Sequence, residues 1–138
     1  MTSYELSPDV AGGLGPATEW ESATPDVVTS LEFEFAGWDG DDLVASFPVT
    51  LATARLREAV EASGLTGITF APVLVSHWPE YDESNQPDLP QWYRLQPVGT
   101  PEVDDAWTGR KMYLTVSERM LQLLQRFDIK DCEITPVR

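Results

Sequence analysis

Two stretches of this chain carry the same pattern of helix start, apolar positions and strand exit. Residues 113–137 align with residues 49–73 without a gap. Thr53 and Ser117 fall on the same position, and both are favoured helix N-caps because their side-chain oxygens accept a hydrogen bond from the first turn. The other matched positions are Arg55 with Arg119, Leu56 with Met120, Val60 with Leu124, Leu65 with Ile129, Phe70 with Ile134 and Pro72-Val73 with Pro136-Val137. We therefore expect two similar βαβ-like modules.

This duplication predicts the fold class. A chain of 138 residues is close to the size of one domain. We expect a single α+β domain whose two helices pack on one side of a mixed sheet. The expected parts are an acidic N-terminal segment (1–47), module one (48–75), an aromatic and acidic insertion (76–108) and module two (111–137).

The two helices differ in their apolar faces. The first is expected from about residue 54 to 63, with Gly64 at the left-handed position after its end. Its apolar stripe is narrow, whereas the second helix has a broad one and should be more central. The broad face consists of Met120, Leu121, Leu123, Leu124 and Phe127. Cys132 aligns with Ile68, so we expect it at a buried apolar position.

Strand predictions outside the helices rest on alternation and turn residues. Residues 27–35 alternate, which predicts a strand with Val27, Leu31, Phe33 and Phe35 inward and Ser30, Glu32 and Glu34 outward. We also expect an edge strand at Tyr4, a loop over 17–27, an edge or bulge at Pro48, a returning strand over 66–75 and a strand starting at Trp92.

The charge is strongly asymmetric. Nine basic residues oppose 23 acidic ones, for a net charge of −14, and none of the basic residues precedes Arg55. Such a field repels nucleic acid and anionic membranes and attracts basic surfaces. Plain solubility is the alternative explanation. We find neither a long apolar run nor a secretory signal at the amino terminus, so we expect a cytoplasmic protein with no membrane or nucleic-acid partner.

Catalytic and metal-binding motifs are not recognisable. His77 is the one histidine, and no serine lies in a Gly-x-Ser-x-Gly elbow. The Asp39/Asp41 spacing is similar to a calcium loop, but Leu43 occupies the next ligand position and Thr50 the last one. With 23 acids, pairs of carboxylates arise by chance. We predict no enzyme activity, no cofactor and no metal site.

Three stretches combine tryptophan or tyrosine with acids. Tryptophan is enriched at binding hot spots, and carboxylates complement a basic partner. At the offset of the duplication Asp105 falls on Asp41, so each module would follow an acidic loop with a tryptophan. The predicted partner-binding residues are Trp38, Asp39, Asp41 and Asp42, then Trp78, Glu80, Tyr81 and Asp82, then Asp104, Asp105 and Trp107.

The module also resembles a pattern in immunity proteins of bacterial polymorphic-toxin systems. The stretch beginning Val116-Ser-Glu-Arg is similar to their helix start and leucine helix, and Phe70-Ala-Pro-Val73 is similar to their closing strand. The resemblance covers about half the chain. It implies a small bacterial protein that binds a cognate toxin with a basic surface and covers or distorts its active site.

Two alternatives remain open at this stage. One is an adaptor or regulatory protein that binds another basic partner. The other is a small enzyme that acts on a cationic substrate through carboxylates in a cleft. The sequence predicts neither the toxin nor the oligomeric state.

Overall fold

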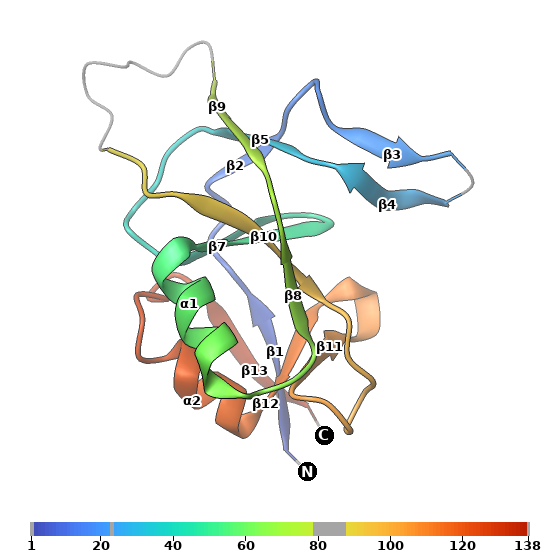
Figure 1. Ribbon diagram of the computed structural model, residues 1–138, viewed down its shortest axis with the longest axis vertical. Coiled ribbons are helices and arrows are strands. Elements are labelled where there is room, and N and C mark those ends of the chain that lie inside the picture. The colour runs from blue at the N-terminus through green and yellow to red at the C-terminus, as the bar shows by residue number, and fades with distance from the viewer. Residues whose placement is uncertain (1, 23, 79–87, 138) are drawn as a thin grey trace.

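The computed structural model describes residues 2–22, 24–78 and 88–137 and has the predicted α+β class, with short strands in several sheets and two helices (Figure 1). One sheet is mixed, because it contains both antiparallel and parallel pairs. Within the described ranges, neither helix has the length and apolar character needed to cross a membrane.

Module one is built on a four-stranded antiparallel sheet in the order β6-β7-β10-β8. Helix α1 (Ala54–Ser63) follows β7 directly and packs against β7 and β10. It ends as predicted, with Gly64 in the left-handed region at φ 76°. The strands are β6 (Leu43–Ser46), β7 (Val49–Thr53), β8 (Ile68–Ala71) and β10 (Trp92–Pro97).

Module two has a sheet of the same size in the order β11-β12-β1-β13, again antiparallel throughout. Helix α2 (Glu118–Leu124) follows β12 directly and packs against β12 and β1. The strands are β1 (Ser3–Ser7), β11 (Ala106–Thr108), β12 (Leu114–Ser117) and β13 (Glu133–Val137). The strand predicted at Tyr4 exists but is not at an edge, because β12 and β13 pair with it on both sides.

Each expected βαβ unit is interrupted by a strand from another part of the chain. The two strands that flank each helix do not pair with one another. Strand β10 lies between β7 and β8, and β1 lies between β12 and β13. Strand β10 precedes module two in the chain but pairs within the sheet of module one. Strand β1 precedes module one in the chain but pairs within the sheet of module two. Local sequence patterns carry no signal for this exchange. The origin of the two modules by duplication stays a prediction.

The main core lies between these sheets and the helices. Leu56 and Val60 of α1 are buried in it, together with the broader face of α2. The prediction for α2 is confirmed for Met120, Leu121, Leu123 and Leu124, all buried, while Phe127 packs at the margin. Cys132 also packs partly buried against this core.

The N-terminal segment forms a second layer together with β9, and this layer encloses a second core with residues of module one. Strands β2 (Gly12–Leu14), β5 (Glu32–Phe35) and β9 (Leu74–His77) form the mixed sheet, while β3 (Glu19–Glu21) and β4 (Thr24–Ser30) form a hairpin. This hairpin occupies the region predicted as a loop. The second core contains Leu31, Phe33, Phe35, Val44, Val49, Leu51 and Trp92.

Several strand predictions require correction. The alternation over 27–35 breaks at Leu31, between β4 and β5, so Val27 is exposed while Val28 is buried. Glu32 is buried instead of facing outward, and its carboxylate accepts a hydrogen bond from the N–H of Ala17 at 2.8 Å. Pro48 lies in the turn between β6 and β7, after a cis peptide bond, rather than at a bulge. The returning strand over 66–75 is divided between β8 and β9, which belong to different sheets.

Candidate partner-binding surface

The segments that carry Trp38 and Trp78 continue from the same end of the mixed sheet. Strands β5 and β9 are parallel, and Phe35 pairs with His77 at their ends. The N–H of Trp78 donates to the carbonyl of Phe35 at 3.1 Å, so the chain after β9 starts beside the loop that carries Trp38. The segment around Ala11 lies there as well, because its carbonyl accepts from the N–H groups of Ala36 and Gly37.

The Trp38 side chain is held in place by its own loop and by the core. Its indole N–H donates to the carbonyl of Asp41 at 2.7 Å, and its ring meets Trp92 edge-on with centroids 5.7 Å apart. Trp38 is half-buried, whereas Trp78 keeps 46% of its surface exposed. A tryptophan that is fixed before binding loses little conformational freedom when a partner covers it.

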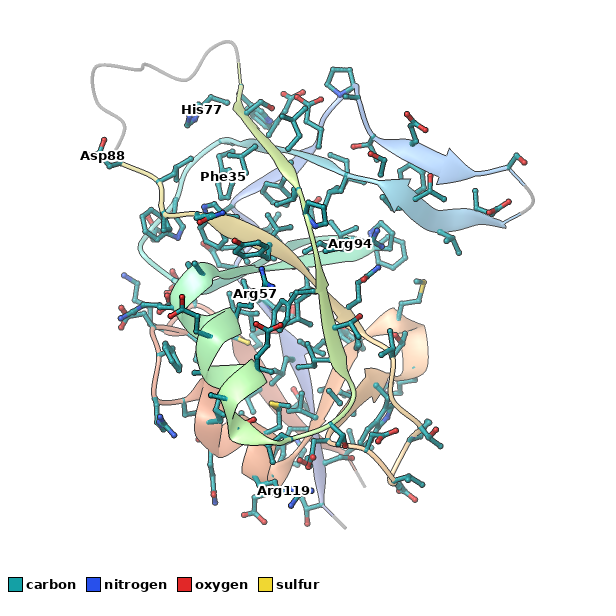
Figure 2. All side chains as sticks on the ribbon, viewed as in Figure 1. Phe35, Arg57, His77, Asp88, Arg94 and Arg119 are labelled. Carbon is teal, nitrogen blue, oxygen red and sulfur yellow. The ribbon has the colours of Figure 1, made fainter. Side chains whose placement is uncertain are left out.

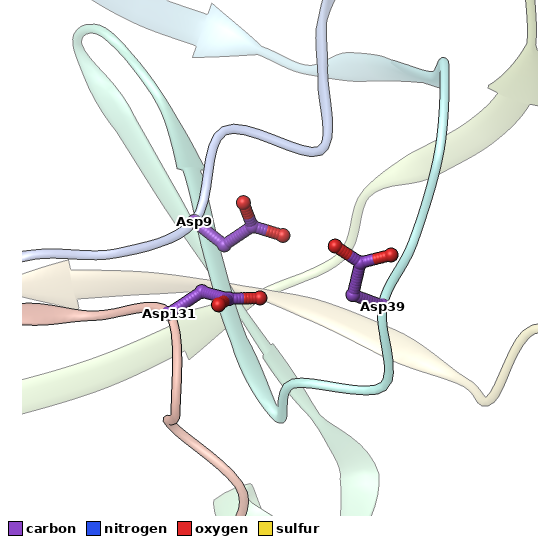
Figure 3. A group of neighbouring side chains, drawn as sticks. All are labelled: Asp9, Asp39 and Asp131. Atoms are coloured by element: carbon purple, nitrogen blue, oxygen red, sulfur yellow. The ribbon is translucent and has the colours of Figure 1, made fainter.

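Three carboxylates converge next to this loop. Asp9, Asp39 and Asp131 each offer an oxygen, and these oxygens lie within 4.8 Å of one another. Figure 3 shows that they come from three separate segments and point toward a common space. Asp39 and Asp131 are exposed and Asp9 is half-buried. We call Asp9, Trp38, Asp39, Trp78 and Asp131 the acidic–aromatic face.

The electrostatics of the cluster are unfavourable for the chain itself. Partial burial and the neighbouring charges of Asp131, Asp39 and Asp41 raise the pKa of Asp9. Lys130 offsets this in part, and its ammonium group donates to the carbonyl of Asp39 at 2.6 Å. One ammonium beside several carboxylates leaves excess negative charge, which a positive group from outside would relieve.

A separate apolar groove is lined by the two residues that flank Asp9 in the chain and by none of the three converging carboxylates. Pro8 and Val10, on either side of Asp9, line a cavity of about 270 Å³ together with Phe47, Met112 and other residues. Val10 and Phe47 keep 71% and 66% of their surfaces exposed. Large exposed apolar side chains gathered around a groove are typical of protein-interaction surfaces.

Asp42, predicted to meet a partner, is instead a buried internal acceptor. Its carboxylate accepts from the Thr53 hydroxyl at 2.6 Å, from the Arg55 guanidinium and from the N–H of Asp128 at 3.0 Å. Burial alone would raise its pKa, but these hydrogen bonds outweigh burial and lower it. We call this arrangement the Asp42 clasp.

Asp105 makes the equivalent set of contacts in module two. It accepts from the Ser117 hydroxyl at 2.8 Å, from Arg119 at 2.6 and 3.0 Å, and from the N–H of Thr66 at 3.0 Å. Burial again opposes these bonds, yet they lower the pKa of Asp105 to about 2. We call this the Asp105 clasp. Its counterpart is Asp42, not Asp41 as the alignment without a gap predicts.

The remaining predicted residues are placed as follows. Trp107 is 5% exposed, and Asp41 is fully buried. Asp104 is half-buried in a turn, where it accepts from the N–H of Thr100 at 2.6 Å. Glu80, Tyr81 and Asp82 lie outside the described residues. The third predicted group is also remote from the first two: Figure 2 shows Arg119, the partner of Asp105, at the opposite end of the molecule from His77.

Nucleophilic chemistry is not favoured at the one cysteine. Burial raises the pKa of Cys132 to about 12, so its thiol is protonated at neutral pH, and the thiolate is the reactive form.

Comparison of the chain with family models, with curated proteins and with solved structures finds no match.

Sequence reasoning missed two members of the face. Asp9 and Asp131 were not predicted, because they are distant from Asp39 in sequence and no spacing rule connects them. The available signal was indirect: Asp9 precedes the glycine pair that begins β2, and Asp131 lies in the turn between α2 and β13.

Proposed function

We propose that this chain is an acidic immunity protein that binds a cognate bacterial toxin domain and neutralises it by stoichiometric contact. The observation that carries the proposal is the acidic–aromatic face, in which Asp9, Asp39 and Asp131 converge beside a fixed tryptophan. Toxins that act on nucleic acids present basic clefts, and carboxylates can occupy such clefts in place of phosphates. The expected site of action is the bacterial cytoplasm.

The face combines the two elements that protein recognition requires. Complementary charge speeds the encounter of two proteins, and the net charge of −14 extends this attraction over the whole chain. Aromatic and apolar contacts then slow dissociation, because they must be exposed to water again when the complex separates. Trp38 and Trp78 supply such contacts.

The structure narrows the set of residues in the proposal. Asp41, Asp42, Asp105 and Trp107 are buried and therefore inaccessible to a partner in this conformation. We assign the partner contacts to the half-buried and exposed members of the acidic–aromatic face.

The test uses the product of the gene next to this one as the probe, because immunity genes usually adjoin their toxin genes. Binding is measured by calorimetry in EDTA for the wild-type chain and for the triple variant Asp9→Asn, Asp39→Asn, Asp131→Asn. We expect the variant to bind about 100-fold more weakly, since close charge pairs at interfaces are worth several kcal/mol.

The control variant removes the same charge from exposed acids elsewhere, as Glu19→Gln, Glu58→Gln, Glu118→Gln. Its affinity should change less than threefold or so, as expected for distant charges that are screened by salt. Equal losses in the two variants would show that the overall field binds and that the face does not. Absence of binding by the wild-type chain would overturn the proposal for this partner.

A further inference from the structure

The apolar groove around Phe47 continues into a second cavity. The first cavity has a volume of about 270 Å³, and the second, which Arg94 lines, has a volume of about 210 Å³. We call them the Phe47 cavity and the Arg94 cavity. They are adjacent, because five residues line both of them: Pro48, Val49, Thr50, Met112 and Leu114.

The charge of these cavities is opposite to that of the chain as a whole. Acids outnumber bases 23 to 9 in the sequence, yet none of the described residues that line either cavity is acidic. The charged residues in the two linings are Lys111 in the Phe47 cavity and Arg94 in the Arg94 cavity. The lining is therefore positive on a chain whose net charge is −14.

The Arg94 guanidinium has no carboxylate partner among the described residues. Its side chain reaches from β10 toward β4, where Nη1 donates to the carbonyl of Val28 at 2.7 Å (Figure 2). A guanidinium has five N–H donors, so this one acceptor leaves most of them available. Arg55, Arg110 and Arg119 differ, because each of them forms an ion pair with a carboxylate.

The half-burial of Arg94 makes an external carboxylate favourable. Burial lowers the pKa of Arg94, because desolvation disfavours the charged form, whereas hydrogen-bonded carboxylates raise the pKa values of Arg55, Arg110 and Arg119. Arginine nevertheless stays charged at neutral pH. A carboxylate from another molecule would pair with this charge and can accept two parallel N–H bonds from it.

The rims of both cavities are apolar and open to solvent. Val27 and Val98 line the Arg94 cavity and keep 44% and 62% of their surfaces exposed, and Val10 and Phe47 are more exposed still. Small-molecule sites usually enclose most of their ligand. Exposed apolar side chains around an open groove are instead typical of a surface that another protein covers.

The backbone is strained in the segment that lies against both cavities. Lys111 and Met112 have φ angles of 52° and 62°, in the left-handed region that residues other than glycine seldom adopt. Such conformations cost of order 1 kcal/mol each and are concentrated at binding sites. Met112 lines both cavities and keeps 41% of its surface exposed.

We propose that the two cavities form a second contact surface, which binds an extended peptide segment of a partner protein that carries one acidic and one apolar side chain. The acidic side chain pairs with Arg94, and the apolar one occupies the Phe47 cavity. This assignment follows from charge, because Asp9 adjoins the residues that line the Phe47 cavity and would repel a carboxylate there. The inference goes beyond the proposed function, since the acidic–aromatic face fits a basic surface and this groove fits an acidic one.

The experiment is a titration of the ¹⁵N-labelled full chain with acetyl-Phe-Ala-Glu-Ala-Phe-amide, followed by NMR. Alternate side chains of an extended peptide point to the same face, so this sequence offers glutamate and phenylalanine in either direction. We expect saturable shifts at Thr50, Gln96 and Met112, which line the cavities. The peptide with glutamine in place of glutamate should bind about tenfold more weakly, because it lacks the charge-assisted hydrogen bonds.

Two variants separate the charge from the apolar contact. Arg94→Met should remove the preference for glutamate over glutamine. Phe47→Ala, at an exposed position that a folded chain tolerates, should weaken the binding of both peptides about equally and keep the preference. Arg126→Met is the matched control, because Arg126 is an exposed arginine that lines neither cavity, and it should leave binding unchanged.

Four results would overturn the proposal. They are equal affinity of the wild-type chain for the glutamate and glutamine peptides, shifts that do not saturate or that lie away from the two cavities, equal weakening by Arg126→Met, and binding of sodium hexanoate as tight as that of the peptide. The last result would indicate a small-molecule pocket. No toxin is used, so the outcome is independent of the test of the proposed function.

Discussion

The two clasps make the same kind of connection at the two ends of the helix pair. In each, a buried aspartate accepts from the hydroxyl that precedes a helix and from the arginine two residues later. In each, the same aspartate also accepts a backbone N–H from the turn after the other helix. Backbone hydrogen bonds also run in the other direction. The N–H of Asp42 donates to the carbonyl of Asp128, and the N–H of Asp105 donates to the carbonyl of Thr66. Each clasp therefore joins the start of one helix to the end of the other.

The differences between the clasps concern the helix caps and the second partners. Ser117 also accepts from the N–H of Met120 at 3.2 Å and so caps α2, whereas the side chain of Thr53 does not cap α1. Arg55 reaches a second carboxylate, Asp128 at 3.2 Å, which the Asp105 clasp lacks among the described residues. Residues at equivalent positions therefore make different hydrogen bonds and ion pairs in the two clasps.

The largest expected effect is the loss of a clasp aspartate. Asp105→Ala leaves the Ser117 hydroxyl and the Thr66 N–H without their acceptor, which should destabilise the chain by about 3 kcal/mol. Urea unfolding followed by circular dichroism measures this change. Asp42→Ala should cost a similar amount, and Glu58→Ala should cost less than about 0.5 kcal/mol as the control. A loss of under 1 kcal/mol for both aspartates would contradict the role of the clasps.

The next effect is on acid stability. The pKa of Asp105 is about 2 in the folded chain and 3.8 as the ordinary value. Because the folded value is depressed, the stabilisation is fully present above about pH 5 and is lost as the pH falls toward 2, by about 2 kcal/mol in total. Asp9 and Asp41 have raised pKa values and act in the opposite direction. The comparison is therefore between the wild-type chain and Asp105→Asn, whose stabilities should converge between pH 5 and 2.

The difference in helix capping predicts a smaller effect on stability, which differs between the two modules. Ser117→Ala removes both a cap and a bond to Asp105, whereas Thr53→Ala removes only the bond to Asp42. We expect Ser117→Ala to be more destabilising by about 1 kcal/mol, the usual value of an N-cap. Chemical denaturation of both variants under one set of conditions gives the difference. Equal losses would show that the cap on α2 contributes nothing measurable.

The smallest expected effect comes from Asp128. Its side chain is 69% exposed, so its ion pair with Arg55 is screened by water. Asp128→Asn should change stability by less than about 0.5 kcal/mol, while the backbone bonds of the same residue to Asp42 remain. A larger loss in thermal or urea unfolding would mean that this carboxylate does more than balance charge.

The sequence predicted the features that depend on neighbouring residues. Helix α1, its end at Gly64, the broad face of α2 and strand β10 follow from periodicity and turn residues, which act over a few positions. The burial of Asp42 and Asp105 was missed, because acids are usually solvated and their arginine partners lie further along the chain. The convergence of Asp9 with Asp39 and Asp131 was missed for the same reason: it is made by tertiary structure alone.

The exchanged middle strands have a consequence for how the chain can be divided. If the chain is separated after His77, the first piece keeps β6, β7, α1 and β8 but lacks β10, and the second keeps β11, β12, α2 and β13 but lacks β1. Neither fragment contains a complete four-stranded sheet, so each is incomplete without the other. Mixed together, they hold every strand that both four-stranded sheets need, so we expect the two fragments to associate and form the native sheets.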